Sequence, residues 1–255
     1  MDRDLRRQVA IVVTFLVTVA VNASANILPL NGLTTAEISD RFQVFVTPAP
    51  YVFGIWALIY LGQAAFTTHQ ARPSRRGDEL LRSLGYLPAA AALLNSLWLV
   101  LWHFEVFALT VPVMFALLAT LATIVLRIRE RPDGRPETRW LVRLPFSIYF
   151  GWITVAAIVN VAAMLSWAGF DGLGIASETW AVAVLLIGVL IALATVRALE
   201  DLAYALVVAW AYVGIAVKEA DTTAVVATAL LGAAVVAVVG VWSALGARTI
   251  GHAAA

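Results

Sequence analysis

The stretch VFALTVPVMFALLATLATIVL, residues 106–126, decides the fold of this chain because it contains no ionisable side chain. A helix that crosses the roughly 30 Å hydrocarbon core of a bilayer needs about 20 consecutive apolar residues. Residues 106–126 meet that length. This stretch is therefore predicted to be a membrane-spanning helix.

The composition of the whole chain agrees with a membrane protein. Of its 255 residues, 62% are hydrophobic and 13% are charged, whereas soluble domains are about 45–50% apolar and about 25% charged. So few charges cannot cover a water-soluble surface, which excludes a soluble enzyme, a nucleic-acid-binding protein and a disordered chain. Cysteine is absent and histidine occurs three times, so we expect no disulfide, no thiolate chemistry and no metal site.

Seven further apolar stretches lie between clusters of charged residues. The chain is therefore predicted to be an all-α, polytopic integral membrane helix bundle of about eight transmembrane helices. The seventh stretch is short. The predicted spans are residues 9–29, 50–70, 85–103, 106–126, 144–167, 179–196, 202–217 and 223–245.

The basic residues test this count and predict an orientation. With eight spans and a cytoplasmic N-terminus, all of the 17 lysines and arginines except Arg41 and Lys218 fall on the cytoplasmic side. Such a bias is the positive-inside rule, and an error in the number of spans would destroy it. Both termini are therefore predicted to be cytoplasmic. An alternative for the first span is a signal peptide, because Ala23-Ser24-Ala25 resembles a cleavage site.

Charge is missing from the centres of the predicted spans. All acidic residues fall in tails, loops or span ends, and the only lysine, Lys218, ends the seventh span. Pumps and coupled transporters keep charged groups inside the membrane because these carry the protons or ions. No paired carboxylates, nucleophile with a base, or metal set occurs in the spans, so we expect a protein that is not an enzyme.

Polar and aromatic side chains instead recur three or four residues apart, which places them on one face of a helix. Counted at 1.5 Å per residue, most of them lie roughly 7–15 Å below the outer membrane surface. Buried amides in lipid need a polar partner. Tryptophans near span ends, including Trp102, are expected to lie in the interfacial aromatic belt or to serve in packing. The residues with this spacing are Asn22, Trp56, Tyr60, Asn95, Trp98, Trp152, Ala156 and Asn160.

Three segments resemble one known family. They are TPAPYVFGIWALIY at 47–60, LNSLW at 94–98 and WITVAAIVN at 152–160. In this order they are similar to motifs of the TspO/MBR family, the tryptophan-rich sensory or translocator proteins. The tryptophan that usually precedes the prolines is absent, with Phe45 and Val46 in its place. The resemblance covers residues 1–168 and implies a five-helix unit there, so residues 169–255 are predicted to be a three-helix extension.

The resemblance also implies a ligand. Members of this family bind tetrapyrroles, so a bound protoporphyrin IX or haem-like molecule is expected, with no cofactor required. We expect the pocket to be lined by Trp56, Tyr60, Asn95, Trp98, Trp152, Ala156, Asn160 and Asn22, under a lid that contains Pro48 and Pro50.

Three hypotheses for the function follow. The first is an integral membrane protein that binds a flat hydrophobic ligand. The second is a transporter or permease for an amphipathic or uncharged solute, and the third is a scaffold that acts through its last three helices. In each case the expected partners are the lipid bilayer and a hydrophobic small molecule, without nucleic acid, and the expected location is the cell membrane, a bacterial inner membrane. Small residues spaced by four in the last spans are compatible with internal packing or with a homodimer.

Overall fold

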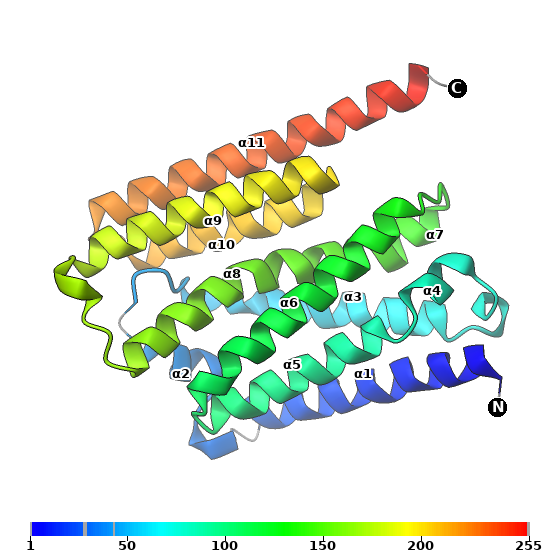
Figure 1. Ribbon diagram of the computed structural model, residues 1–255, viewed down its shortest axis with the longest axis horizontal. Helices are drawn as coiled ribbons and strands as arrows, with labels where there is room; N and C mark the ends of the chain where they lie inside the picture. The colour runs from blue at the N-terminus through cyan, green and yellow to red at the C-terminus, as the bar shows by residue number, and fades with distance from the viewer. Residues whose placement is uncertain (1, 28–29, 43, 254–255) are drawn as a thin grey trace. The chain divides into compact units, whose positions relative to one another are not determined.

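The eight predicted spans correspond to eight apolar helices. The computed structural model describes residues 2–27, 30–42 and 44–253, and this part of the chain contains helices and no β-strand (Figure 1). Residues 28 and 29, the last two of the first predicted span, lie outside the described residues. The apolar helices are α1 (Arg3–Ile27), α3 (Ile55–Gln70), α5 (Leu87–His103), α6 (Phe107–Glu130), α8 (Leu144–Trp167), α9 (Ser177–Leu199), α10 (Leu202–Lys218) and α11 (Thr223–Ala253).

The prediction of an all-α polytopic membrane bundle is confirmed. Among the described residues, six segments are long and apolar enough to cross a bilayer, and two shorter apolar helices, α5 and α10, have 17 residues each. A helix of that length spans about 26 Å, which is at the lower end of the range for a membrane span. The apolar helices therefore contact the lipid bilayer.

Short helical elements connect the spans. The Thr34 side chain caps α2 by accepting from the Glu37 backbone N–H, and the Thr34 N–H donates to the Glu37 carboxylate, which is the capping box typical of a helix start. The described short elements are η1 (Leu30–Gly32), α2 (Thr35–Asp40), η2 (Pro50–Gly54), η3 (Pro73–Arg75), α4 (Glu79–Leu84), α7 (Pro136–Thr138), η4 (Arg139–Arg143) and η5 (Gly172–Gly174).

The chain divides into two compact units. Unit 1 is Met1–Arg41 with Ile55–Ile153, and unit 2 is Phe42–Gly54 with Thr154–Ala255. This division differs from the predicted division at residue 168 in two ways. The second half of α8 belongs with the last three helices, and so does the segment 42–54 that leads into α3.

In unit 1, α1 packs mainly along α5, and α3 packs against the start of α8. The Thr18 hydroxyl lies 3.0 Å from the Ser96 hydroxyl and donates to the Ala92 carbonyl at 2.8 Å, which joins α1 to α5. On the other side of α3, a Cβ on Gly62 would lie 3.2 Å from Pro145 Cβ. Gly62 therefore allows α3 to approach α8 closely.

Charged side chains collect at the end of unit 1 that the sequence assigns to the cytoplasm. Arg82 pairs with Asp4 at 2.6 Å, and Arg135 pairs with Asp78 at 2.8 Å. These contacts explain why α1 begins at Arg3, whereas hydropathy predicted a start near residue 9. The charged first turns of the helix are stabilised by the loops and not by lipid.

The opposite end of unit 1 is closed by the segment around α2. Arg41 donates to Glu105 at 2.5 Å, and the Asn31 amide donates to the His103 carbonyl at 3.1 Å. The predicted outer loops therefore meet at one end of the unit, away from the arginine-rich loops.

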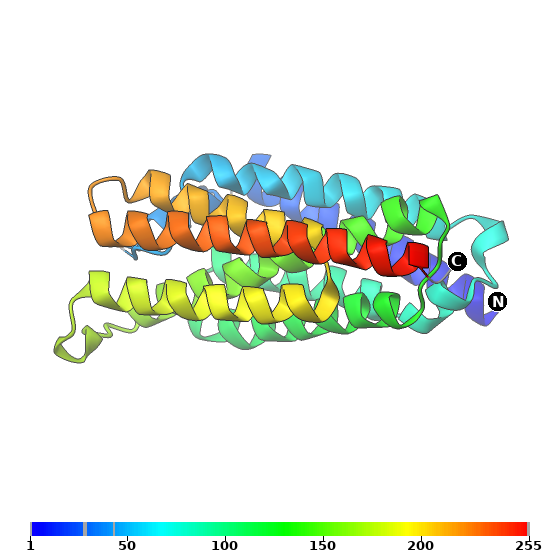
Figure 2. The ribbon, with the colours of Figure 1, turned by 90° about the horizontal axis from the view of Figure 1, so that it is seen from above.

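Unit 2 contains α9, α10 and α11, which run side by side in antiparallel succession (Figures 1 and 2). Asp201 caps the start of α10 by accepting from the Tyr204 backbone N–H at 3.2 Å. The Tyr212 hydroxyl donates to the Leu185 carbonyl at 2.9 Å, which joins α10 to α9. Side chains such as Leu190 and Trp242 are 65% and 75% exposed, as expected for surfaces that face lipid.

Candidate functional site

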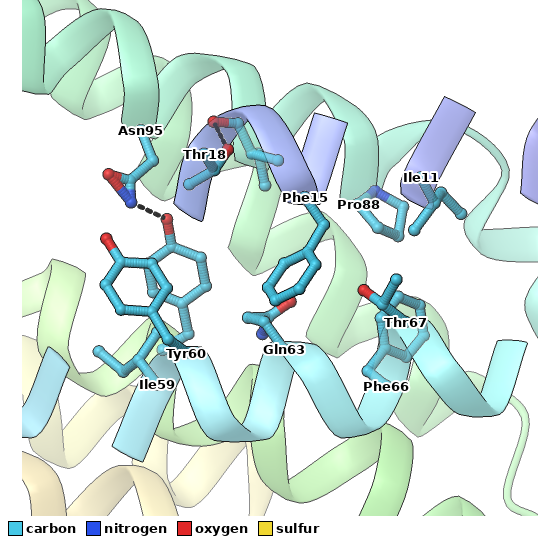
Figure 3. Close-up of a pocket in the computed structure, with 13 residues that line it drawn as sticks. Ile11, Phe15, Thr18, Ile59, Tyr60, Gln63, Phe66, Thr67, Pro88 and Asn95 are labelled. Carbon is cyan, nitrogen blue, oxygen red and sulfur yellow. Dashed lines mark hydrogen bonds between the residues drawn. The ribbon is translucent and has the colours of Figure 1, made fainter. Parts of the chain in front are cut away.

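A cavity lies within unit 1, between α1, α3, α5 and the start of α8 (Figure 3). Its volume is about 20 Å³. A cavity needs roughly 10–15 Å³ to hold one water molecule. The lining residues are Ile11, Phe15, Thr18, Ile59, Tyr60, Gln63, Phe66, Thr67, Pro88, Ala91, Ala92, Asn95 and Tyr149.

The face of α3 that borders the cavity carries three polar side chains beside the apolar Ile59 and Phe66. Tyr60, Gln63 and Thr67 line it and are three and four residues apart, so they lie on one face of the helix. Phe15 of α1 lies beside Gln63 in Figure 3, and Ile11 also lines the cavity from α1. A row of polar groups on α3 therefore faces mainly apolar side chains of α1.

Asn95 lies at one end of this cavity and is 1% exposed. Its Nδ2 donates to the Tyr149 hydroxyl at 2.9 Å, a hydrogen bond from α5 to α8. Its Oδ1 is buried and has no hydrogen-bond partner among the described residues. The hydrogen bond from Nδ2 therefore holds the Asn95 amide in place, and Oδ1 remains available to accept a hydrogen bond.

Gln63 presents a second polar atom of this kind. Its Nε2 is buried without a hydrogen-bond partner in the described part of the chain. An unsatisfied buried donor or acceptor costs about 1–3 kcal/mol, and such groups are rare in native proteins. Two of them around one cavity, a donor on Gln63 and an acceptor on Asn95, indicate that a polar molecule or group belongs there.

Asn22 reaches the same end of the cavity from α1. Its amide donates to the Thr18 carbonyl at 2.9 Å, and it lies close enough to the Tyr60 hydroxyl to interact with it. Of the predicted site residues, Asn22, Tyr60 and Asn95 are thus at or beside the cavity.

Two predicted tryptophans form an aromatic cluster with the tyrosines of the cavity. Trp56 stacks on Tyr60 with the ring centres 5.6 Å apart. The Trp56 ring also makes edge-to-face contacts with Tyr149 and Trp152, both at 6.1 Å. Such pairs contribute about 0.5–1.5 kcal/mol each beyond area burial, so this cluster fixes the positions of Tyr60 and Tyr149.

Trp98 belongs to a different cluster. It stacks on Trp102 at 5.5 Å, and Trp102 makes an edge-to-face contact with Phe107 at 5.2 Å. Trp102 is 3% exposed and donates from its indole N–H to the Thr35 carbonyl at 3.3 Å. Of the two roles expected for Trp102, packing is the one that the structure supports. Trp102 is an interior residue that holds α2 against α5.

The remaining predicted residues lie in unit 2. Ala156 and the buried Asn160 are in the second half of α8, and Pro48 and Pro50 precede and begin η2. Pro48 is buried whereas Pro50 is exposed. The predicted set of site residues is thus divided between the two compact units.

Sequence reasoning missed several residues of the cavity, notably Phe15, Gln63 and Tyr149. A signal for Gln63 was present, because it is three residues after Tyr60 and is an amide inside a predicted span. Tyr149 is three residues before Trp152 and could have been found by extending the polar and aromatic face of the fifth span. Phe15 carries no such signal.

The cavity has the chemistry of a binding site for a small, uncharged group. Its lining contains amide and hydroxyl groups and no charged side chain. Within the described residues, no group of three histidine, aspartate or glutamate side chains is placed to hold a metal ion.

The model of a family described as TSPO-like protein matches residues 8–242, a range that includes α9, α10 and most of α11. No curated protein and no solved structure matches the chain significantly.

Proposed function

The chain belongs to the TSPO-like protein family, and from this we propose that it is a membrane protein that binds a hydrophobic ligand at the cavity of unit 1. The family match and the apolar helices support a multi-pass membrane protein of this kind. The proposed role is binding without catalysis, in the cell membrane.

One observation carries the proposal. The buried Gln63 Nε2 and Asn95 Oδ1 border the same small cavity and have no hydrogen-bond partner among the described residues. Ligand pockets are mostly apolar with a few polar groups that fix orientation. A ligand that offers an acceptor to Gln63 and a donor to Asn95 would satisfy both atoms.

The size of the cavity restricts the ligand. A volume of about 20 Å³ holds one water-sized group, whereas pockets for drug-sized ligands are roughly 300–1,000 Å³. A tetrapyrrole macrocycle therefore does not fit the cavity in this closed form. Its binding, which the family resemblance favours, requires α1 to separate from α3. α1 packs lightly on α3 and extensively on α5, so the α1–α3 contact is the one we expect to open.

Titration of the purified protein with metal-free protoporphyrin IX, followed by quenching of tryptophan fluorescence, tests the proposal. We expect saturable quenching by the unmodified protein. Each of the substitutions Gln63→Leu and Asn95→Leu should raise Kd about tenfold, because each removes one hydrogen bond to the ligand, of about 1–1.5 kcal/mol.

The control is Thr120→Val, which replaces a half-buried threonine of α6 whose hydroxyl donates within its own helix, to the Ala116 carbonyl. It should leave Kd unchanged. If the protein binds protoporphyrin IX saturably and neither Gln63→Leu nor Asn95→Leu weakens this binding, the site lies elsewhere. A lack of saturable quenching by the unmodified protein would exclude protoporphyrin IX as the ligand.

A further inference from the structure

The segment that leads into α3 packs on α10 within unit 2. The Ala49 backbone N–H donates to the Gly214 carbonyl at 3.0 Å. Val52 is completely buried, and both Val52 and Pro48 lie against Gly214. We call the contact of Pro48, Ala49 and Val52 with Gly214 the Gly214 contact.

Glycine is required at position 214 by this packing. A Cβ there would lie 2.2 Å from Val52 Cγ2 and 3.2 Å from Pro48 Cβ. The first distance is far below any real contact between carbon atoms, so even alanine would push the segment away. Gly54, in the same segment, has open space where a Cβ would be built.

The Gly214 contact lies at membrane depth. Gly214 precedes Lys218, the end of α10, by four residues, or about 6 Å along the helix. One helical turn deeper, Tyr51 makes an edge-to-face contact with Trp210 at 5.3 Å. Irregular backbone is tolerated at this depth only where protein satisfies its polar groups. The hydrogen bond from the Ala49 N–H to the Gly214 carbonyl satisfies one such polar group of the segment.

The segment is continuous with the ligand-site helix. Gly54 is followed directly by Ile55, the first residue of α3, and Tyr60 and Gln63 come within the next three turns. A change in the path of residues 48–52 therefore acts on the start of α3. Within the segment itself, the described backbone bonds are short turns such as Val52 N–H to Ala49 O at 3.0 Å.

We propose that Gly214 is a positioning residue: α10 holds the segment 48–52 through the Gly214 contact, and this contact sets the affinity of the ligand site on α3. The second part of this inference rests on the proposed function. It assigns a role to the last three helices, which is to fix the chain that enters α3.

Labelling of a single cysteine measures the contact without any ligand. The natural chain contains no cysteine, so Ala49→Cys introduces a single thiol at a position that is 6% exposed. In this background, Gly214→Ala should make maleimide labelling about tenfold faster, because overpacking of this kind costs enough to release the segment. The matched control Gly54→Ala should leave the labelling rate unchanged.

A second-site variant separates displacement of the segment from general misfolding. Val52→Ala removes the Cγ2 that a Cβ at position 214 would strike. The combination Gly214→Ala with Val52→Ala should therefore recover most of the slow labelling. Faster labelling that Val52→Ala does not reverse, or no change with Gly214→Ala, would overturn the proposed contact.

Affinity for protoporphyrin IX, measured without the cysteine, tests the second part. Gly214→Ala should weaken binding several-fold and Gly54→Ala should not. If Gly214→Ala releases the segment and Kd stays the same, the coupling to the ligand site is refuted. If the unmodified protein does not bind, the proposed function and the coupling fail together, while the labelling result still decides whether α10 holds the segment.

Discussion

The Gln8 side chain of α1 donates from Nε2 to the Gln70 carbonyl of α3 at 2.5 Å, and the Gln70 side chain returns a hydrogen bond from Nε2 to the Gln8 carbonyl at 3.4 Å. Both residues are buried, at 3% and 1% exposure. The same Gln8 amide also donates to the Arg72 carbonyl at 3.0 Å. The last carbonyls of a helix have no partner within the helix, so Gln8 supplies from α1 the cap that α3 lacks.

Gln8→Leu should therefore destabilise unit 1. The substitution removes the hydrogen bond to the buried Gln70 carbonyl, the last of α3, and the bond to the Arg72 carbonyl two residues further on, at a cost of about 1–3 kcal/mol. We expect a lower Tm in detergent, measured by the change in helical circular dichroism. Thr120→Val, a polar-to-apolar change at a half-buried residue of α6 whose hydroxyl donates within its own helix, is the control and should shift Tm much less. Equal shifts in the two variants would show that Gln8 does not cap α3.

The hydrogen bond between Asn95 and Tyr149 should be measurable as a coupling energy. Asn95→Ala, Tyr149→Phe and the double variant complete a thermodynamic cycle in which only the bond from Nδ2 to the Tyr149 hydroxyl is shared. Hydrogen bonds between membrane helices contribute about 0.6 kcal/mol on average and up to about 1.7. Because this one is buried, we expect a value in the upper half of that range. A coupling indistinguishable from zero would mean that the two side chains act independently.

The positions of the helices could be predicted from the sequence because a membrane span needs length and lack of charge, both of which are local properties. α6 is an example: the stretch 106–126 lies almost entirely within Phe107–Glu130. The start of α1 was misplaced because Asp4 and Gln8 owe their helical conformation to contacts with residues 70–82, which are distant in sequence.

The site could be predicted only in part, because helical spacing identifies a face but not the neighbour of that face. Trp98 and Asn95 are three residues apart, yet Asn95 lines the cavity and Trp98 stacks on Trp102. Helical spacing also places Trp152 and Asn160 on one face of α8, although the two residues belong to different compact units. Which residues share a cavity depends on how the helices pack against one another, and the residue spacing within a single helix does not show this packing.

The ion pairs around Asp78 should make stability depend on pH in the acid range. Burial alone would raise the pKa of the Asp78 carboxyl, but hydrogen bonds from the Arg135 guanidinium at 2.8 Å and the Leu81 N–H at 3.1 Å outweigh burial and hold the pKa below its ordinary value of 3.8. The folded protein therefore keeps this carboxylate ionised at a pH where the unfolded chain binds a proton. The stabilisation is present above that ordinary pKa and is lost as the pH falls through the lower, folded value.

Thermal unfolding of the Asp78→Asn variant measures this contribution. The variant should have a lower Tm than the natural protein at pH 7, and the difference should shrink as the pH falls below 3.8, the ordinary pKa of the carboxyl. Glu79→Gln, at the neighbouring exposed carboxylate, is the matched control and should change the pH profile much less. A difference that stays constant down to the lowest pH would refute a role for the Asp78 charge.

The packing of α9 on α10 gives the last prediction. A Cβ on Gly188 would lie 2.2 Å from the Tyr212 hydroxyl, the group that donates to the Leu185 carbonyl. Gly188→Ala should thus break that hydrogen bond as well as overpack the contact, with a loss of about 1–3 kcal/mol in the free energy of unfolding. Tyr212→Phe removes the oxygen that the new methyl group strikes, although it leaves the Leu185 carbonyl without its donor. If the clash causes the loss, Gly188→Ala should cost less in the Tyr212→Phe background than in the natural protein, whereas equal costs would locate the strain at Ile158, whose Cδ1 would lie 3.0 Å from the same Cβ.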